Sequence, residues 1–173
     1  MLLKTKKAID YIHSNYDYEY IIHTNLSSLW NIPILLSLYN EIPRNHFFGG
    51  HMMFNYFITG TGIIISRDLI PIFLNMNVYD YSDNNDVTIS HYMIQQQIPI
   101  YNLEHSQNYK MDWQILCENC NDITSPHHKN NITVIDDNTD TNKILYFRIR
   151  NGTIEQDLYI TKKILHKLYN IDI

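Results

Sequence analysis

One acidic residue, Asp86, opens an apolar segment in the stretch Asn85-Asp86-Val87-Thr88-Ile89-Ser90. A carboxylate in such a place can act as a general base, which takes the proton from a reacting hydroxyl group. Aspartate is also one of the best residues at the N-cap of a helix, where its side chain accepts a backbone N–H. The sequence therefore leaves Asp86 with two candidate roles, in catalysis or in capping.

Two glycines form the second signal, in the stretch Thr59-Gly60-Thr61-Gly62 that precedes three consecutive isoleucines at 63–65. Glycine adopts positive backbone dihedrals and leaves room for a ligand beside the backbone. An unbroken β-branched run is typical of a strand that is covered on both faces. We predict a tight turn at Gly60 and Gly62, followed by a buried strand. The turn either lines a ligand site or only shapes the chain.

The third signal is the polar cluster His23-Thr24-Asn25-Leu26-Ser27-Ser28, which follows a predicted strand over residues 18–22. Ligands bind at the carboxyl ends of strands in an open α/β sheet. Asn25 and Ser27 are therefore candidate ligand-binding residues. The alternative is that the cluster caps the next helix.

Two further groups have open interpretations. Arg148 and Arg150 lie on one face of a predicted strand because side chains alternate along it. They either pair with a phosphate or are solvated charges on an edge strand. Cys117-Glu118-Asn119-Cys120 and the pair His127-His128 have the residue types of a zinc site, but the spacing is short and no second pair of ligands supports it. We expect two free thiols on a loop and no metal site.

Periodicity predicts the elements that position these residues. The final helix, for example, places Leu158, Ile164, Leu165 and Leu168 on one apolar face. Residues 104–142 are polar and weakly patterned, so we predict a long loop region there. The alternation of strands and helices favours a single α/β domain over residues 1–173. Helices are predicted at 4–14, 31–39, 67–75 with Ser66 as N-cap, 86–96 and 157–170, and strands at 18–22, at 47–57 as two short strands around Gly49-Gly50, and at 63–65, 99–103 and 144–150.

Composition excludes several classes of protein. The chain has 173 residues, 45% of them hydrophobic, and a net charge of −5. A negative net charge argues against nonspecific nucleic-acid binding, which needs a basic surface. No apolar run approaches the roughly 18 to 20 residues of a membrane span, and the opening residues 1–7 lack the apolar core of a signal peptide. We therefore expect a soluble, intracellular protein.

The order of the three signals resembles that of GT-A glycosyltransferases. The chain is most similar to the fringe-like and β-1,3-galactosyltransferase-like group and to small glycosyltransferase-like proteins of giant DNA viruses. The resemblance covers about residues 15–95 and lies in the strand ending in Asn25-Leu26-Ser27, in Gly60-Thr61-Gly62, and in Asn85-Asp86-Val87. It implies a mixed sheet flanked by helices, and location in the host cytoplasm or the virion if the protein is viral.

The resemblance also implies roles for individual residues. The protein would transfer a sugar from a nucleotide-sugar donor to a hydroxyl of a glycan or protein acceptor, with Asp86 as the base. Asn25, Ser27 and Arg148 would lie on the donor side, and Gly60, Thr61 and Gly62 on the acceptor side. The family's Asp-x-Asp motif is replaced by Asn25-Leu26-Ser27, whose neutral oxygens bind Mg²⁺ or Mn²⁺ less well than carboxylates. Such a metal would come with the diphosphate of the donor.

The chain also departs from the family in length. About 17 residues precede the first predicted strand, whereas the family begins with two strand-helix units that bind the nucleotide. This implies a shortened enzyme whose missing donor half is supplied by a partner chain. The alternative is a non-catalytic relative that acts as a binding or assembly protein.

Aromatic residues before the glycine motif have two interpretations. Phe47, Phe48, Phe54, Tyr56 and Phe57 are expected in the core, because such residues bury large areas. The alternative is a surface that stacks on a sugar. Four histidines close to the candidate residues are interpreted as ordinary polar residues, namely His23, His46, His51 and His91.

Overall fold

The computed structural model describes residues 2–77, 84–103, 110–112, 144–149 and 154–171. The chain forms two compact units. Unit 1 contains residues 1–25 and 41–106, and unit 2 contains residues 26–40 and 107–173. Each unit is described separately, and the grouping of the whole chain into a single domain stays a prediction.

Unit 1 is a mixed four-stranded sheet with helices. The strand order is β1-β4-β3-β5. β4 is antiparallel to both of its neighbours, and β3 is parallel to β5. The elements are α1 (Leu2–Asn15), β1 (Tyr20–His23), β3 (Phe48–Met53), β4 (Phe57–Ser66), a short 3₁₀ helix η1 (Arg67–Leu69), α3 (Ile70–Asn75), α4 (Asn85–Gln95) and β5 (Ile100–Asn102).

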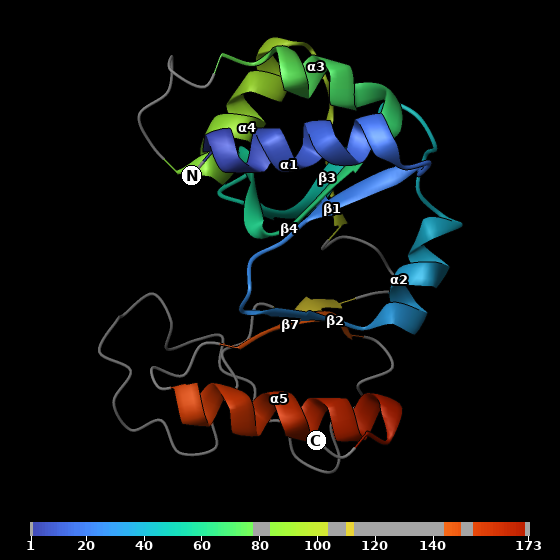
Figure 1. Cartoon of the computed structure of the whole chain (residues 1–173), viewed down its shortest axis with the longest axis vertical. Coiled ribbons are helices and arrows are strands. Elements are labelled where there is room, and N and C mark those ends of the chain that lie inside the picture. Colours follow the sequence, from blue (N-terminus) through green and yellow to red (C-terminus); the bar gives the residue numbers. More distant parts are fainter. Residues whose placement is uncertain (1, 78–83, 104–109, 113–143, 150–153, 172–173) are drawn as a thin grey trace. The chain divides into compact units, whose positions relative to one another are not determined.

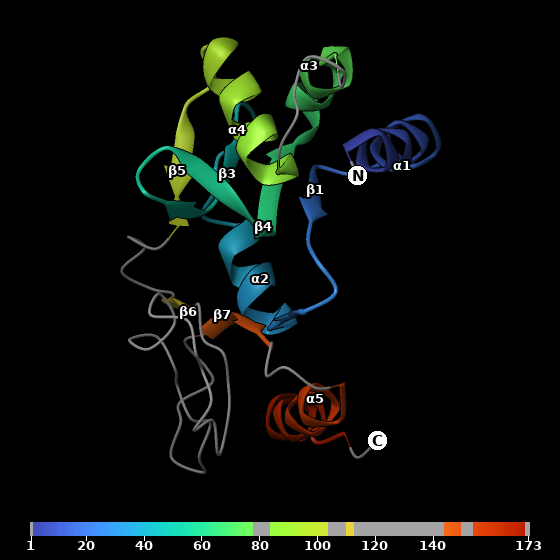
Figure 2. The same ribbon diagram turned by 90° about the vertical axis from the view of Figure 1, so that its left-hand side faces the viewer.

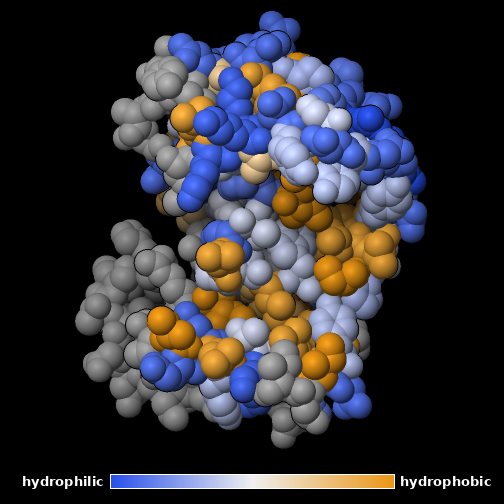
Figure 3. Space-filling view, viewed as in Figure 1, coloured by the Kyte–Doolittle hydropathy of each residue, from blue (hydrophilic) through white to orange (hydrophobic). Residues whose placement is uncertain are grey.

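Helices α1, α3 and α4 lie on one face of this sheet (Figures 1 and 2). Their apolar residues pack with Phe48, Ile58, Ile63 and Ile65 from the strands in one hydrophobic core. Ile63, Ile64 and Ile65 are at most 1% exposed, which confirms the prediction of a strand covered on both faces. The outer surface of α1 is mainly hydrophilic (Figure 3), as expected for an amphipathic helix.

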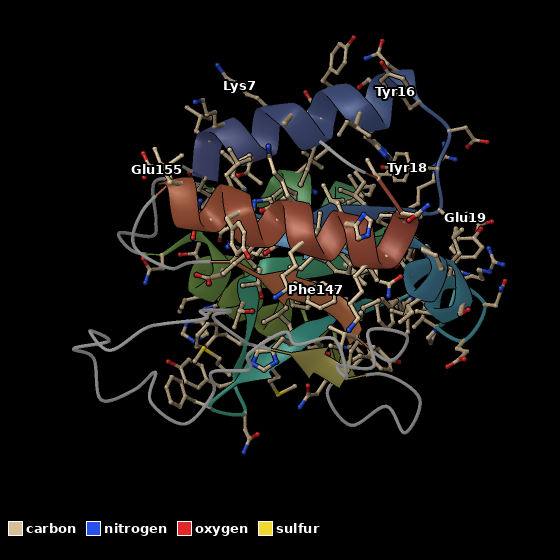
Figure 4. All side chains as sticks on the ribbon, turned by 90° about the horizontal axis from the view of Figure 1, so that it is seen from below. Lys7, Tyr16, Tyr18, Glu19, Phe147 and Glu155 are labelled. Carbon is tan, nitrogen blue, oxygen red and sulfur yellow. The ribbon has the colours of Figure 1, made fainter. Side chains whose placement is uncertain are left out.

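Unit 2 is smaller and has its own core. Its three-stranded sheet has the order β2-β7-β6, with β2 antiparallel and β6 parallel to β7. Phe147 of β7, labelled in Figure 4, packs in a hydrophobic cluster with Ile160 and Ile164 of α5. The hydroxyl of Tyr169 accepts a hydrogen bond from the N–H of Ile32 (2.9 Å), which joins α5 to α2. The elements are β2 (Ser28–Trp30), α2 (Ile32–Tyr39), β6 (Lys110–Asp112), β7 (Ile144–Arg148) and α5 (Ile154–Tyr169).

The structure confirms the predicted α/β fold class, with a mixed sheet and helices. Most predicted helices and strands are present with shifted ends. Of the predicted loop region 104–142, the structure describes only β6. Arg150 and the candidate zinc ligands Cys117, Cys120, His127 and His128 lie outside the described residues.

Two local predictions are wrong, and a third is confirmed only in position. Gly60 and Gly62 do not form a turn before a strand, because both lie inside β4. One strand, β3, runs through Gly49 and Gly50 where two short strands were predicted. Ser66 occupies the predicted N-cap position, before η1, but its side chain makes no capping hydrogen bond. Its hydroxyl accepts the N–H of Phe47 (2.9 Å) and donates to the Asp68 carboxylate (2.6 Å), so a bond between distant segments takes the place of the local cap.

Candidate functional site

β4 is irregular at the glycine motif. In its pairing with β3, Gly50 lies opposite Ile63 and Met52 lies opposite Ile58. Residues 59–62 of β4 therefore lie opposite the single residue His51 of β3. This mismatch forms a large bulge in β4. Bulges bend a strand and are common next to active sites. The motif that resembled a turn is thus a distorted part of a strand.

Gly50 makes this bulge sterically allowed. A Cβ atom at Gly50 would lie 2.2 Å from the carbonyl oxygen of Gly62 and 2.6 Å from Cγ2 of Ile58. Its φ of 157° is also one that other residues rarely adopt. The two strands approach each other here too closely for any side chain.

Side chains of α4 supply hydrogen-bond partners to the irregular half of β4. The N–H of Gly60 donates to Oδ2 of Asp86 (2.9 Å), and the N–H of Ile58 donates to Oγ of Ser90 (2.9 Å). Asp86 and Ser90 are four residues apart, so they lie on one face of the helix. On the strand, Thr61 accepts a hydrogen bond at its carbonyl oxygen from Oγ1 of Thr24 (2.7 Å). α4 therefore covers a strand edge that β1 does not reach.

Asp86 lies in the first turn of α4, and the N-cap position belongs to Asn84. Besides the bond from Gly60, its Oδ1 accepts the N–H of Val87 (3.0 Å). An ionised carboxylate has about four lone-pair sites, so each oxygen keeps capacity for another donor. The structure thus brings together Gly60 and Asp86, which the sequence placed in two separate motifs.

His23 lies at the end of β1, where it pairs with Ile63. Its side chain is half-buried, and among the described residues its Nδ1 atom has no hydrogen-bond partner. Burial lowers the pKa of His23, while the negative charge of Asp86 opposes that shift. An imidazole within electrostatic range of the candidate base is a polar group that can contact a ligand or a water at this end of the strand.

A set of buried polar side chains lines the bulge. Thr59 and Thr61 share a hydrogen bond between their hydroxyls (2.5 Å), and both are at most 2% exposed. His51, opposite the bulge, is 6% exposed, and burial lowers its pKa to about 4. His51 is therefore neutral at physiological pH.

The predicted donor-side residues fall in both units. Asn25 belongs to unit 1, whereas Ser27 and Arg148 belong to unit 2. Ser28 pairs with Arg148 in the register of β2 and β7, and the carbonyl of Ser27 accepts the N–H of Ile149 (2.7 Å). Ser27 thus directly precedes the strand residue that pairs with Arg148, while the grouping of Ser27 and Arg148 with Asn25 stays a prediction.

In the part of the chain that the structure describes, no three His, Cys, Asp or Glu side chains gather as a candidate metal site. Asn25 and Ser27 offer only neutral oxygens where carboxylates would bind Mg²⁺ or Mn²⁺ better.

Within the same described residues, no helix has the length and apolar character needed to cross a membrane.

No protein-family model matches the chain, and a search of curated proteins found none similar to it. The site is therefore interpreted from its geometry. Neither Ser90 nor the imidazole of His23 was predicted from the sequence as a functional group. Ser90 lies one helical turn after Asp86, and this i, i+4 spacing could have indicated it. Nothing local to His23 indicates its proximity to Asp86, because their closeness depends on the packing of α4 against the sheet.

Proposed function

We propose that the protein is a glycosyltransferase-like enzyme that moves a sugar from a nucleotide-sugar donor to a hydroxyl of a glycan or protein acceptor. One observation carries the proposal. The Asp86 carboxylate and the Gly60 backbone meet at 2.9 Å, although 26 positions separate them in the chain. The contact between the two motifs of the sequence resemblance, with His23 in electrostatic range of the carboxylate, supports the proposal.

Asp86 is suited to the role of base because its position is held from two directions. The N–H groups of Gly60 and Val87 orient its two oxygens. A base must lie within hydrogen-bond reach of the proton that it takes. The remaining lone pairs on the carboxylate are available to an acceptor hydroxyl.

In the proposed reaction, the acceptor oxygen attacks the anomeric carbon of the donor sugar. A new carbon–oxygen bond forms as the bond to the diphosphate breaks, and the nucleoside diphosphate leaves with the electron pair. Asp86 takes the hydroxyl proton. The chain's own residues thus hold the acceptor and accept its proton, and a divalent cation, if the reaction uses one, arrives with the donor diphosphate.

The donor side of the proposal includes Asn25, Ser27 and Arg148. Amide and hydroxyl groups can donate hydrogen bonds to phosphate oxygens, and a guanidinium can pair with them in two parallel bonds. A partner chain that completes the nucleotide-binding half is part of the proposal.

The geometry of Asp86 also favours a second candidate function. Both carboxylate oxygens already accept backbone N–H groups, so Asp86 has a sufficient structural role in fastening α4 to β4. The protein would then be a non-catalytic relative of the glycosyltransferases that binds or assembles with another component.

Thermal shift of the whole chain against a panel of nucleotide sugars, with and without Mn²⁺, is the first test. A ligand that binds the folded state raises the melting temperature.

Donors that shift the melting temperature are then incubated with a glycan panel, and nucleoside diphosphate release is measured. We expect Asp86→Asn to lower the rate by about a hundredfold or more while keeping the fold. The control is Asp10→Asn, which changes an exposed carboxylate on α1.

Two results would separate the candidates. If a donor binds and its turnover does not depend on Asp86, the proposed base is wrong. If no nucleotide sugar shifts the melting temperature of the well-folded chain, the non-catalytic function is favoured.

A further inference from the structure

Three rings form an exposed aromatic surface at the turn between β3 and β4. Phe54 is 76% exposed and Tyr56 is 44% exposed. Their ring planes are inclined by 23° with centroids 6.4 Å apart, and Tyr56 is similarly inclined by 32° to His91 of α4 at 5.7 Å. We call Phe54, Tyr56 and His91 the aromatic platform. The ring of Phe54 stacks with that of Tyr56, the ring of His91 is tilted against Tyr56, and all three residues are exposed to solvent.

The backbone at the platform is strained. Phe54 has a φ of 51° and Asn55 a φ of 61°, and the N–H of Tyr56 donates to the carbonyl of Met53 (3.1 Å). Positive φ at both central residues is the pattern of a type I′ turn, in which asparagine followed by glycine is preferred. A bulky residue such as Phe54 is a genuine outlier in this region. Such strain is characteristic of ligand-binding sites.

Unit 1 holds the platform firmly in place. The largely buried ring of Phe57 packs below it, 5.0 Å from the ring of Tyr56 and 6.4 Å from that of Phe54. His91 belongs to the same helix as Asp86, whose carboxylate bonds to Gly60 on the strand that Tyr56 precedes. The platform and the candidate base are therefore built on the same pair of elements, β4 and α4.

The size and charge of the platform restrict its ligand. Three partly exposed side chains, with the 45% exposed Ile94 one turn after His91, present far less area than the roughly 800 Å² per partner of a stable protein interface. The net charge of −5 disfavours a polyanionic ligand. A small, neutral, ring-shaped group with an apolar face matches both the area and the ring geometry, and the hydroxyl of Tyr56 and the imidazole of His91 add polar groups at the rim.

We propose that the aromatic platform binds a sugar ring of the acceptor by stacking. This inference rests on the proposed function and extends it, because it names the place where the acceptor is held. Within the described fold, Phe54 contributes only its ring contacts, whereas its backbone is strained and its side chain is exposed. Ligand binding explains why this unfavourable conformation is kept.

The test uses the full-length protein and a panel of neutral methyl glycosides and short glycans, with binding measured by saturation-transfer NMR. The first variant is Phe54→Gly. Glycine adopts positive φ without strain, so we expect an unchanged or higher melting temperature together with at least a tenfold weaker affinity. The matched control is Tyr16→Ala, which removes a ring that is 58% exposed and pairs with Tyr11 elsewhere in unit 1. This control is expected to bind as the wild type does.

Three results would overturn the proposal. The first is a folded wild-type protein that binds no glycan of the panel, and the second is a Phe54→Gly variant with wild-type affinity. The third is binding of uridine or adenosine to these rings in preference to every glycan, which would make the platform a base-stacking site. The two proposals also fail separately. Asp86-dependent transfer that Phe54→Gly leaves unchanged contradicts only the platform, whereas Phe54-dependent glycan binding without transfer from any donor contradicts only the enzyme.

Discussion

The two halves of β4 obtain their backbone hydrogen bonds from different partners. Residues 63–66 lie between β1 and β3 in regular antiparallel register. Residues 58–62 extend past the end of β1, and residues 59–62 bulge away from β3. This segment bonds instead to side chains of Asp86, Ser90 and Thr24. Both halves are largely buried, so both must satisfy their polar groups.

This difference means that the regular half contributes to stability, whereas the irregular half carries the candidate function. The regular half needs only backbone partners, and its isoleucines serve the core. The irregular half depends on particular side chains, and one of them is the candidate base. A strand that recruits side chains in this way brings the carboxylate of Asp86 to its backbone. We therefore predict that substitutions in and around the irregular half change stability through the individual contacts described above. Four experiments test this prediction.

The largest effect is expected for Gly50→Ala. The new Cβ would overlap the carbonyl of Gly62, so the strands must separate, and we expect a loss of about 3 kcal/mol in the free energy of unfolding. Gly60→Ala is the matched control, since its Cβ would lie 3.4 Å from Oδ2 of Asp86 and needs only a small adjustment. Its loss should stay below about 1 kcal/mol. Urea denaturation measures both, and equal losses would contradict the close approach of the strands.

The second prediction concerns the bond between Asp86 and the bulge. Asp86→Ala leaves the N–H of Gly60 without its acceptor and should lower the free energy of unfolding by about 2 kcal/mol. Asp86→Asn keeps one acceptor oxygen, which can take the N–H of Gly60 while the bond from Val87 is lost, so its loss should be smaller, about 1 kcal/mol. Urea denaturation of both variants checks this. A similar loss in the two would mean that the charge, and not the acceptor oxygen, holds α4 to β4.

The third prediction concerns Ser90, which is fully buried. Ser90→Ala removes the acceptor for the N–H of Ile58 and should lower the free energy of unfolding by about 1.5 kcal/mol. Ser14→Ala changes an exposed serine on α1 and should have an effect within about 0.5 kcal/mol. Faster hydrogen exchange at the Ile58 amide in Ser90→Ala is the residue-specific measurement. Unchanged exchange there would show that the bond does not protect the strand.

The fourth prediction is a pH dependence from His51. Burial lowers its pKa in the folded state to about 4, whereas the unfolded chain has the ordinary value near 6.5. Between these values the unfolded state binds more protons, so stability rises with pH across this window and falls as the pH drops from about 6.5 to 4. For the one proton involved, the slope is at most about 1.4 kcal/mol per pH unit. The difference in unfolding free energy between wild type and His51→Gln, measured at each pH, isolates it, and parallel curves would contradict it.

Much of the fold was predictable because it depends on local pattern. The helix at α5 follows from the spacing of Leu158, Ile164, Leu165 and Leu168, although its buried face includes Ile160 and leaves Leu158 52% exposed. The buried strand at 63–65 follows from three consecutive isoleucines. The candidate residue Asp86 was predictable at the start of α4 for the same reason. These features need only the periodicity of a helix or strand and the preferences of its ends.

The errors all involve contacts between distant segments. Gly60 and Gly62 have the composition of a turn, but pairing with β3 and side chains from α4 hold them in a strand. Ser66 has the type of a helix cap, but its hydroxyl bonds to Phe47 and Asp68. The expectation that the aromatic residues lie in the core holds for Phe47, Phe48 and Phe57 and fails for Phe54 and Tyr56, which the turn exposes.

The amino-acid sequence determines which segments of this protein are helices and strands and in which order the candidate residues occur, because these depend on neighbours along the chain. The tertiary structure decides that Asp86 meets Gly60, that His23 lies in range of its charge, and that Phe54 stands exposed at a strained turn. Each of these follows from strand register and helix packing. Register and packing are set by the summed burial and hydrogen bonding of residues far apart in the chain, and no local pattern encodes that sum.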